Sequence, residues 1–191
     1  MPRSLATAAA RVFRTTMATS RLGIMRANVM AGKRLQFANR LFSTVTGDNI
    51  RELRPGETAP IEKTDEEWFD ELGEETFTIL RAHGTEPPGS HEYNFNKKDG
   101  VYHCAGCNTP LFKSSDKYNS GTGWPSFFDS IPGAVVTKTD KSHFMVRTEI
   151  LCASCHGHLG HVFPDGPKPT HLRHCCNGAA LTFVPRTNSS N

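Results

Sequence analysis

The chain has 191 residues, which is enough for one domain with an extension but short of two full domains. No stretch approaches the ~20 apolar residues that a membrane-spanning helix requires, so we expect no membrane association. The net charge of +3 is unevenly distributed along the chain, and this distribution identifies the first segment.

A basic leader occupies the first 42 residues. Eight basic residues and no acidic residue precede Asp48, whereas the remainder carries 14 basic and 19 acidic residues. The leader is rich in Arg, Ser, Thr and Ala and lacks the continuous apolar region of a secretory signal, so residues 1–42 are predicted to be an organelle transit peptide. The stretch 40–43, Arg-Leu-Phe-Ser, resembles a mitochondrial processing site with cleavage after Phe42. We expect a mitochondrial location, with the plastid as the alternative. A basic arm that binds nucleic acid or a membrane is the other interpretation.

The next segment is predicted to be a linker followed by helical structure. Residues 43–63 are polar and contain proline, which is typical of a linker. Thr64 with Glu67 three residues later is a capping-box pattern, which predicts a helix start. We expect one or two short helices within residues 65–83, separated at Gly73 because glycine disfavours the helix interior.

After the helices the pattern changes to strands. The segments 100–103 and 108–112 flank a Cys-x-x-Cys pair and predict a hairpin with a metal knuckle at its tip. Residues 144–150 alternate between apolar and polar side chains, which predicts a strand with one polar face. Residues 181–185 predict a closing strand, and the polar residues 186–191 are predicted to be a disordered tail.

Two Cys-x-x-Cys pairs form a predicted metal site. Its four cysteines are Cys104, Cys107, Cys152 and Cys155. Four thiolates complete the tetrahedral coordination of a structural zinc ion and leave no open position for catalysis. The gap between the pairs is much longer than in a compact zinc ribbon, so one zinc per chain would tie together two distant knuckles. Redox-active or disulfide-bonded pairs are the alternative, which a reducing organelle interior disfavours.

A glycine-rich loop presents a tryptophan. Gly121 and Gly123 allow the backbone to turn sharply, and Pro125 stiffens the chain that follows Trp124. The indole is therefore expected on a constrained loop, either as a core anchor or as part of a site.

Two histidines lie close together in the segment His158-Leu159-Gly160-His161. On a regular strand His158 and His161 would face opposite sides, because side chains alternate. A β-bulge at Gly160 would bring them to one face. The pair is then a candidate for proton transfer or for binding a substrate oxygen.

Cys175 is a candidate nucleophile outside the metal set. Arg173 and His174 precede it, and basic neighbours favour a thiolate, although His174 would point to the opposite face of a strand. Asn177 lies two residues beyond Cys175 and would share its face.

At these residues the chain resembles the B-type methionine sulfoxide reductases, which reduce the R epimer of methionine sulfoxide. The resemblance lies in the two Cys-x-x-Cys pairs and in the motifs Ser120–Phe127, Gly157–Phe163 with Asp165–Pro167, and Arg173-x-Cys175-x-Asn177. It implies a mainly β domain over residues 64–185, with two small antiparallel sheets in a compact barrel-like arrangement, short N-terminal helices, and a structural zinc away from the active site.

The resemblance also implies residue roles. Cys175 is implied to attack the sulfoxide sulfur and to become a sulfenic acid, a state that thiols reverse. The residues implied to organise protons around the sulfoxide oxygen are His158, His161 and Asn177. The residues implied to bind the substrate side chain are Trp124, Phe127 and Arg173. The implied activity is a thiol-dependent repair of oxidised methionine, protein-bound or free.

One departure from the family pattern concerns regeneration. Many family members have a resolving cysteine where this chain has Thr122, so no disulfide can link that loop to Cys175. Cys176 is adjacent to Cys175, and the Cα separation of ~3.8 Å between neighbours is below the usual disulfide range. We interpret Cys176 as a buried apolar-type residue, with a resolving role as the alternative. Direct reduction by thioredoxin, or by glutaredoxin with glutathione, is then expected.

Two other functions remain as hypotheses. A zinc-stabilised binding module would leave the cluster of His158, His161 and Cys175 unexplained, and the acidic remainder of the chain disfavours nucleic acid. A degenerate reductase that serves only as an interaction domain is disfavoured by the intact cluster. We expect a monomer with no nucleic-acid partner.

Overall fold

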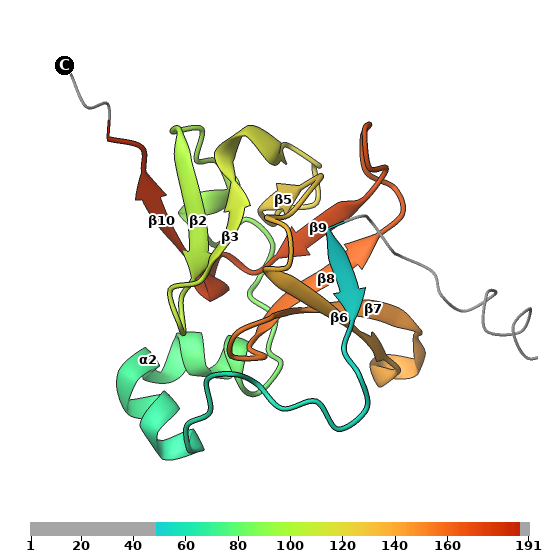
Figure 1. The fold of residues 1–191 in the computed structure, drawn as a ribbon. Helices are drawn as coiled ribbons and strands as arrows, with labels where there is room; N and C mark the ends of the chain where they lie inside the picture. The colour runs from blue at the N-terminus through green and yellow to red at the C-terminus, as the bar shows by residue number, and fades with distance from the viewer. Residues whose placement is uncertain (1–48, 188–191) are drawn as a thin grey trace, which may run out of the picture. The chain divides into compact units, whose positions relative to one another are not determined.

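The computed structural model describes residues 49–187 (Figure 1). The predicted transit peptide at residues 1–42, with its cleavage site, and the last four residues lie outside this range. The one α-helix of the described part is α2 (Asp65–Leu80), and the short 3-10 helices are η1 (Glu92–Asn94), η2 (Ser114–Asp116), η3 (Ser142–Phe144) and η4 (Gly178–Ala180).

Two β-sheets make up most of the described chain. The seven-stranded sheet has, in spatial order, β1 (Ile50–Glu52), β6 (Val135–Asp140), β7 (Arg147–Cys152), β8 (His158–Phe163), β9 (Arg173–Cys176), β5 (Ser126–Phe127) and β4 (Lys117–Tyr118). The three-stranded sheet has the order β10 (Leu181–Pro185), β2 (Gly100–Cys104) and β3 (Pro110–Lys113). Figure 1 shows the three-stranded sheet above α2 and the strands β6 to β9 beside it.

The prediction of a mainly β fold with two sheets is confirmed, but two of its details are wrong. One sheet is large, and β1 joins it parallel to β6, whereas every other pairing is antiparallel. No barrel closes, because β1 and β4 remain as separate edges of the larger sheet. These edge strands have only three and two residues, too few to form a continuous ladder with each other.

The helix α2 begins and breaks where the sequence predicts. Thr64 Oγ1 accepts a hydrogen bond from the Glu67 amide at 3.2 Å, and the Glu67 carboxylate accepts one from the Thr64 amide at 2.8 Å. Gly73 has φ 71° and ψ 171°, which interrupts the helix and divides it into two short segments. Trp68 and Leu80 bury the inward face against the core.

Two segments differ from their predicted structure. The predicted linker contains β1, whose three residues are too few to show a period-2 pattern. The strand expected from residue 144 begins only at Arg147, because Phe144 lies in η3 with a φ of 56°. This left-handed conformation is incompatible with an extended strand.

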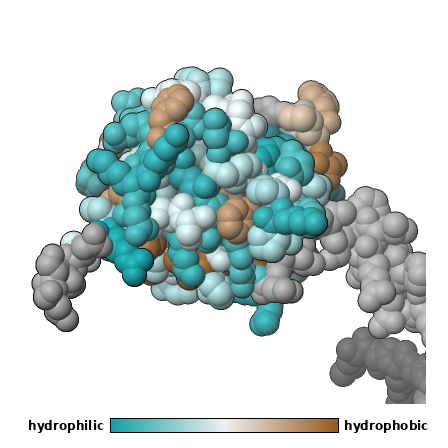
Figure 2. Space-filling model, turned by 90° about the horizontal axis from the view of Figure 1, so that it is seen from above, coloured by the Kyte–Doolittle hydropathy of each residue, from teal (hydrophilic) through white to brown (hydrophobic). Residues whose placement is uncertain are grey.

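A cluster of aromatic rings forms the centre of the core. Phe112 of β3 stacks on Phe127 of β5 with ring centroids 4.4 Å apart, and Tyr102 of β2 meets Phe127 edge-on at 5.1 Å. These contacts join the two sheets, and aromatic pairs of this kind contribute roughly 0.5–1.5 kcal/mol beyond their burial. The face shown in Figure 2 is mainly hydrophilic, with few separate hydrophobic residues. Within residues 49–187 no helix has the length and apolarity required to cross a membrane.

Candidate active site

A row of polar side chains crosses the larger sheet and contains Cys175. Glu149 of β7 is paired with His161 of β8, and His161 is paired with Cys175 of β9. Cys175 is in turn paired with Ser126 of β5. Directly opposed residues on antiparallel strands share a face, with Cβ atoms about 4.5–5.5 Å apart. The register therefore places the Cys175 thiol next to the His161 imidazole, with the Glu149 carboxylate on the neighbouring strand on the other side of His161.

A β-bulge in β8 places both histidines on this face, as predicted. The register between β7 and β8 shifts so that Ile150 opposes Gly160 while Leu151 opposes His158, which leaves Leu159 as the extra residue. The rings of His158 and His161 lie 5.5 Å apart. Gly160 has a φ of 150°, and a Cβ there would lie 2.0 Å from the Cys175 carbonyl oxygen. Only glycine leaves room for the main chain of β9 at this point, so the bulge depends on Gly160.

The Cys175 thiol lies in a partly buried pocket. Burial raises its pKa above the ordinary value, and the nearby Arg173 guanidinium opposes this shift only in part. Thr122 occupies the position at which many members of the resembled family have a resolving cysteine. Its Oγ1 lies 4.0 Å from the Cys175 sulfur. His174 does not help to form the thiolate, since its ring is buried on the other face. Burial therefore favours the thiol form at neutral pH and outweighs the effect of the basic neighbour Arg173, which by itself favours a thiolate.

This raised pKa predicts how Cys175 reacts with alkylating agents. Because only the thiolate reacts, the rate of alkylation by iodoacetamide should rise about tenfold per pH unit from about pH 7 to 9 without a plateau. The measurement is the rate of labelling of the Cys175 peptide by mass spectrometry, with Cys175→Ser as the control. A plateau below about pH 8 would contradict the burial argument.

His161 is held by a carboxylate beside the pocket. Its Nε2 lies 2.9 Å from Asp140 Oδ2, and Arg147 donates to the same oxygen at 2.7 Å. Burial lowers the pKa of His161, and the Asp140 hydrogen bond opposes this only partly. Burial would raise the pKa of Asp140, but hydrogen bonds from Ser142, His161 and Arg147 outweigh it and hold that pKa well below its usual range. The imidazole is thus neutral at pH 7 and oriented by an ionised carboxylate.

His158 is held by a second carboxylate. Its Nδ1 lies 2.6 Å from Glu149 Oε1, and His83 Nδ1 lies 2.6 Å from the same oxygen. Burial would raise the pKa of Glu149, but the hydrogen bonds from the two histidines lower it to about 2. The Nε2 of His158 is buried without a hydrogen-bond partner among the described residues. Each predicted histidine therefore has its own carboxylate, and neither carboxylate was singled out from the sequence.

A buried glutamate fixes the tryptophan loop. The main-chain oxygen of Glu86 accepts a hydrogen bond from Trp124 Nε1 at 3.0 Å, which orients the indole at the pocket edge. The Glu86 carboxylate accepts hydrogen bonds from the amides of Gly178 and Ala179 at 2.7 and 2.9 Å. This residue lies between the predicted helices and the first predicted strand, in a segment for which the sequence indicated no function. Its single sequence signal is an acidic residue directly before two prolines.

Asn177 lies beside the pocket, but its side-chain amide forms hydrogen bonds with main-chain atoms. Its Oδ1 accepts a hydrogen bond from the Glu86 amide at 3.1 Å, and its Nδ2 lies 3.4 Å from the Leu159 carbonyl oxygen. The side chain is only 3% exposed. In this structure the Asn177 side chain therefore connects the segment that contains Glu86 to the β8 bulge.

The two remaining predicted substrate-binding residues, Arg173 and Phe127, have different surroundings. Arg173 forms a two-pronged ion pair with Asp165, with contacts of 2.8 and 2.9 Å, and lies over the Phe163 ring. Phe163 borders the pocket, and the Arg173 guanidinium is near enough to Cys175 to lower the pKa of that thiol in part. Phe127 is fully buried between Phe112 and Tyr102, so its predicted contact with substrate must be corrected to a core role.

The pocket around Cys175 has a volume of about 140 Å³. Its walls include Thr85, Trp124, Phe163 and Asn177 as well as His161. Thr85, Arg147 and His161 also border an adjoining pocket of about 300 Å³, which contains His158 and Glu149. The smaller pocket suits one short side chain, and the larger one continues from it.

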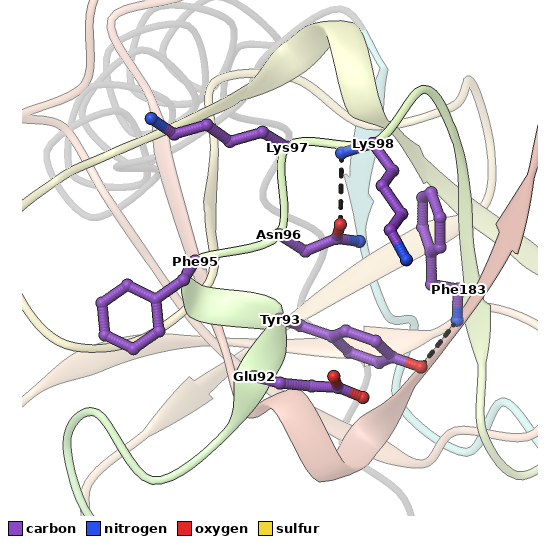
Figure 3. A pocket seen from close by; sticks show the side chains of 7 residues that line it. All are labelled: Glu92, Tyr93, Phe95, Asn96, Lys97, Lys98 and Phe183. Carbon is purple, nitrogen blue, oxygen red and sulfur yellow. Dashed lines mark hydrogen bonds between the residues drawn. The ribbon is translucent and has the colours of Figure 1, made fainter.

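A further cavity of about 650 Å³ carries no such chemistry (Figure 3). In it the Tyr93 hydroxyl accepts a hydrogen bond from the Phe183 amide at 3.1 Å, and Asn96 Oδ1 accepts one from the Lys98 amide at 3.1 Å. Its walls contain neither a thiol nor an imidazole. These contacts support the local fold, and we assign the chemistry to the Cys175 pocket.

The four cysteines of the paired motifs converge as predicted. All four sulfur atoms lie within 4.8 Å of one another. Across the two knuckles, the Sγ atoms of Cys104 and Cys155 are 3.6 Å apart, and those of Cys107 and Cys152 are 3.5 Å apart. A tetrahedral ion with metal–sulfur bonds of ~2.3 Å requires sulfur separations of about 3.8 Å. The arrangement therefore fits a four-thiolate metal site.

Comparisons with known proteins agree with this geometry. The SelR domain family matches residues 72–185. The chain is 55% identical over 127 residues to the peptide methionine sulfoxide reductase MsrB of Pseudomonas fluorescens strain Pf-5, covering 66% of this chain and 98% of that protein. It is 52% identical over 130 residues to the MsrB of Agrobacterium fabrum strain C58, covering 67% of this chain and 96% of that protein. The chain therefore belongs to the methionine sulfoxide reductase B family.

Proposed function

We propose that this chain reduces the R epimer of methionine sulfoxide to methionine, in oxidised proteins or as the free amino acid. The observation that carries the proposal is the register that pairs Cys175 with His161 in a pocket walled by Trp124. Family membership supports the reaction class. The proposed indole contact is with the methyl group of the substrate side chain, since Trp124 offers an apolar face at the pocket edge.

The proposed first step transfers oxygen from the substrate to the enzyme. The Cys175 sulfur attacks the sulfoxide sulfur, and the thiol proton passes through His161 to the sulfoxide oxygen. The oxygen then passes to the Cys175 sulfur, the sulfur–oxygen bond of the substrate and the transient sulfur–sulfur bond both break, methionine leaves, and Cys175 is left as a sulfenic acid. The substrate sulfur gains two electrons and the Cys175 sulfur loses two. Support comes from the lowered pKa of His161, because it leaves the imidazole neutral at pH 7 with a free lone pair that can accept the thiol proton.

Regeneration is proposed to use an external thiol. The first thiol condenses with the sulfenic acid to give a mixed disulfide and water, and a second thiol releases reduced Cys175. Cys176 is 1% exposed and packed in the core, which supports an apolar-type role. The side chain of Thr122 lies near the Cys175 sulfur but has no thiol with which Cys175 could form a disulfide. Thioredoxin, or glutaredoxin with glutathione, remains the proposed donor.

The remaining proposals concern the metal, the assembly and the location. We propose that the four-thiolate site holds one structural zinc ion, because it is closed and fully formed by thiolates. We propose that the chain acts as a monomer, without nucleic acid as a partner, in the mitochondrion or alternatively the plastid. The location rests only on the composition of the leader.

The experiment that tests the reaction supplies each epimer of a blocked methionine sulfoxide with excess dithiothreitol. The chain without residues 1–42 should form sulfide from the R epimer and not from the S epimer. A folded, zinc-loaded protein that reduces neither epimer would favour the binding-module hypothesis. Equal reduction of both epimers would contradict the proposed specificity.

A further inference from the structure

A second cluster of metal-ligating atoms lies beside the proposed active site. His83 follows α2, Glu149 lies in β7 and His158 lies in β8, so three separate segments converge. The Nδ1 atoms of both histidines lie 2.6 Å from the same Glu149 oxygen, and the three ligating atoms lie within 4.8 Å of one another. Of these three residues only His158 is predicted to take part in the reaction, as one of the residues that organise protons around the sulfoxide oxygen.

The three donors match a known class of coordination. Two neutral imidazoles and one carboxylate are the ligands of many zinc, iron, nickel and copper sites, whereas calcium and magnesium prefer oxygen alone. Glu149 is ionised at neutral pH, since its pKa is lowered to about 2. An ion between the donors would separate each nitrogen–oxygen pair from 2.6 Å to about 3.0–3.3 Å. The His83 side chain is 55% exposed and has room to make this movement.

The surroundings leave space for an ion and its water ligands. The cluster borders the solvent-accessible pocket of about 300 Å³, so entry does not require unfolding. His83 has a φ of 56°, a conformation that costs most residues energy, and it turns this exposed side chain back toward Glu149. Lys138 of β6 is paired with Glu149 of β7. Its positive charge repels a cation, so we expect this site to bind a metal ion more weakly than the four-thiolate site.

We propose that His83, Glu149 and His158 form a second, reversible binding site for a divalent transition-metal ion, distinct from the four-thiolate site. In the metal-free protein the two imidazoles donate from Nδ1 to Glu149, and when the ion binds the two Nδ1 atoms each neutral imidazole carries its proton on Nε2 instead. An ion held here binds His158, a residue predicted to organise the substrate oxygen. Metal binding should therefore inhibit the reductase, and this consequence rests on the proposed function, whereas the binding itself does not.

Cobalt(II) is the probe that distinguishes the two sites. Zinc-loaded protein without residues 1–42 is titrated with Co²⁺ in a buffer free of chelators and thiols. One additional equivalent should bind and show visible d–d absorption without the near-ultraviolet thiolate-to-cobalt charge-transfer band. His83→Asn should weaken this binding by about tenfold or more, because it removes one of three protein ligands and tolerates the positive φ. His171→Asn is the matched control, since His171 is also exposed with a φ of 60°.

Three outcomes would overturn the proposal. The first is that no equivalent binds beyond the four-thiolate site. The second is a charge-transfer band, which would assign the ion to cysteine sulfur. The third is equal weakening by His83→Asn and His171→Asn.

A kinetic experiment tests the consequence separately. Sulfoxide reduction is followed in a single turnover of the reduced enzyme, because dithiothreitol itself binds transition metals. Each variant is compared with its own metal-free rate, and the Co²⁺ concentration for half-inhibition should rise about tenfold or more in His83→Asn but not in His171→Asn. Binding without inhibition would overturn the assigned role of His158 while leaving the metal site intact. A protein inactive without metal would instead argue against the proposed function.

Discussion

Replacing Cys175 with serine is expected to abolish sulfoxide reduction, with a loss of at least ~10⁴-fold in the single-turnover rate. A serine hydroxyl is far less acidic than a thiol and far less nucleophilic toward sulfur, and it cannot form a sulfenic acid. The measurement is methionine formed per enzyme from the R epimer without external thiol. The parent chain should form one equivalent and the variant none.

The neighbouring cysteine provides a matched control for this prediction. Cys176 is fully buried in the core, so Cys176→Ala should lower the melting temperature slightly through a small cavity while leaving single-turnover reduction intact. Multiple turnovers with dithiothreitol should also continue. Turnover that survives Cys175→Ser would mean that another residue is the nucleophile. A Cys176→Ala protein that completes one turnover and then stops with every reductant would instead identify Cys176 as a resolving residue.

Removing one thiolate from the metal site is expected to have the second-largest effect. Cys104→Ser should lose the bound zinc and lower the melting temperature by at least ~10 °C, because the loss of several kcal/mol shifts a domain of this size by a few degrees per kcal/mol. The effect should be large because the proposed ion would join the knuckle between β2 and β3 to the knuckle after β7. Zinc content by elemental analysis and thermal unfolding by circular dichroism are the measurements.

The same core variant serves as a control for the metal site. Cys176→Ala also removes a buried thiol but should retain one zinc per chain. If the parent chain folds with no metal and its four cysteines are oxidised in pairs, the structural zinc is refuted. If Cys104→Ser keeps both the metal and the melting temperature, then Cys104 is not a required ligand.

Local patterns in the sequence were sufficient to predict several elements. The capping box of Thr64 and Glu67 and the break at Gly73 depend on neighbouring residues, and both occur as predicted. The bulge at Gly160 was predictable because only a register shift brings His158 and His161 to one face. The convergence of the four cysteines was predictable because a shared metal site would require it, whatever the path of the chain between them, and the four sulfur atoms do lie within 4.8 Å of one another.

Other features depend on contacts between residues distant in the sequence. Glu86 contacts Trp124 and the residues after β9 through hydrogen bonds that no local pattern encodes. Phe127 belongs to a motif typical of the site, yet strand pairing turns its ring into the core. The pairing of β1 with β6 likewise joins two segments more than 80 residues apart.

The sequence by itself determined the reaction class, the candidate nucleophile and the candidate metal ligands, because these depend on residue chemistry and short spacings. Only the tertiary structure decided that Asp140 orients His161, that Glu149 binds both His158 and His83, and that burial keeps Cys175 protonated. The physical reason is that a hydrogen-bond partner and a pKa depend on which groups the sheet register brings together and on how much water it excludes.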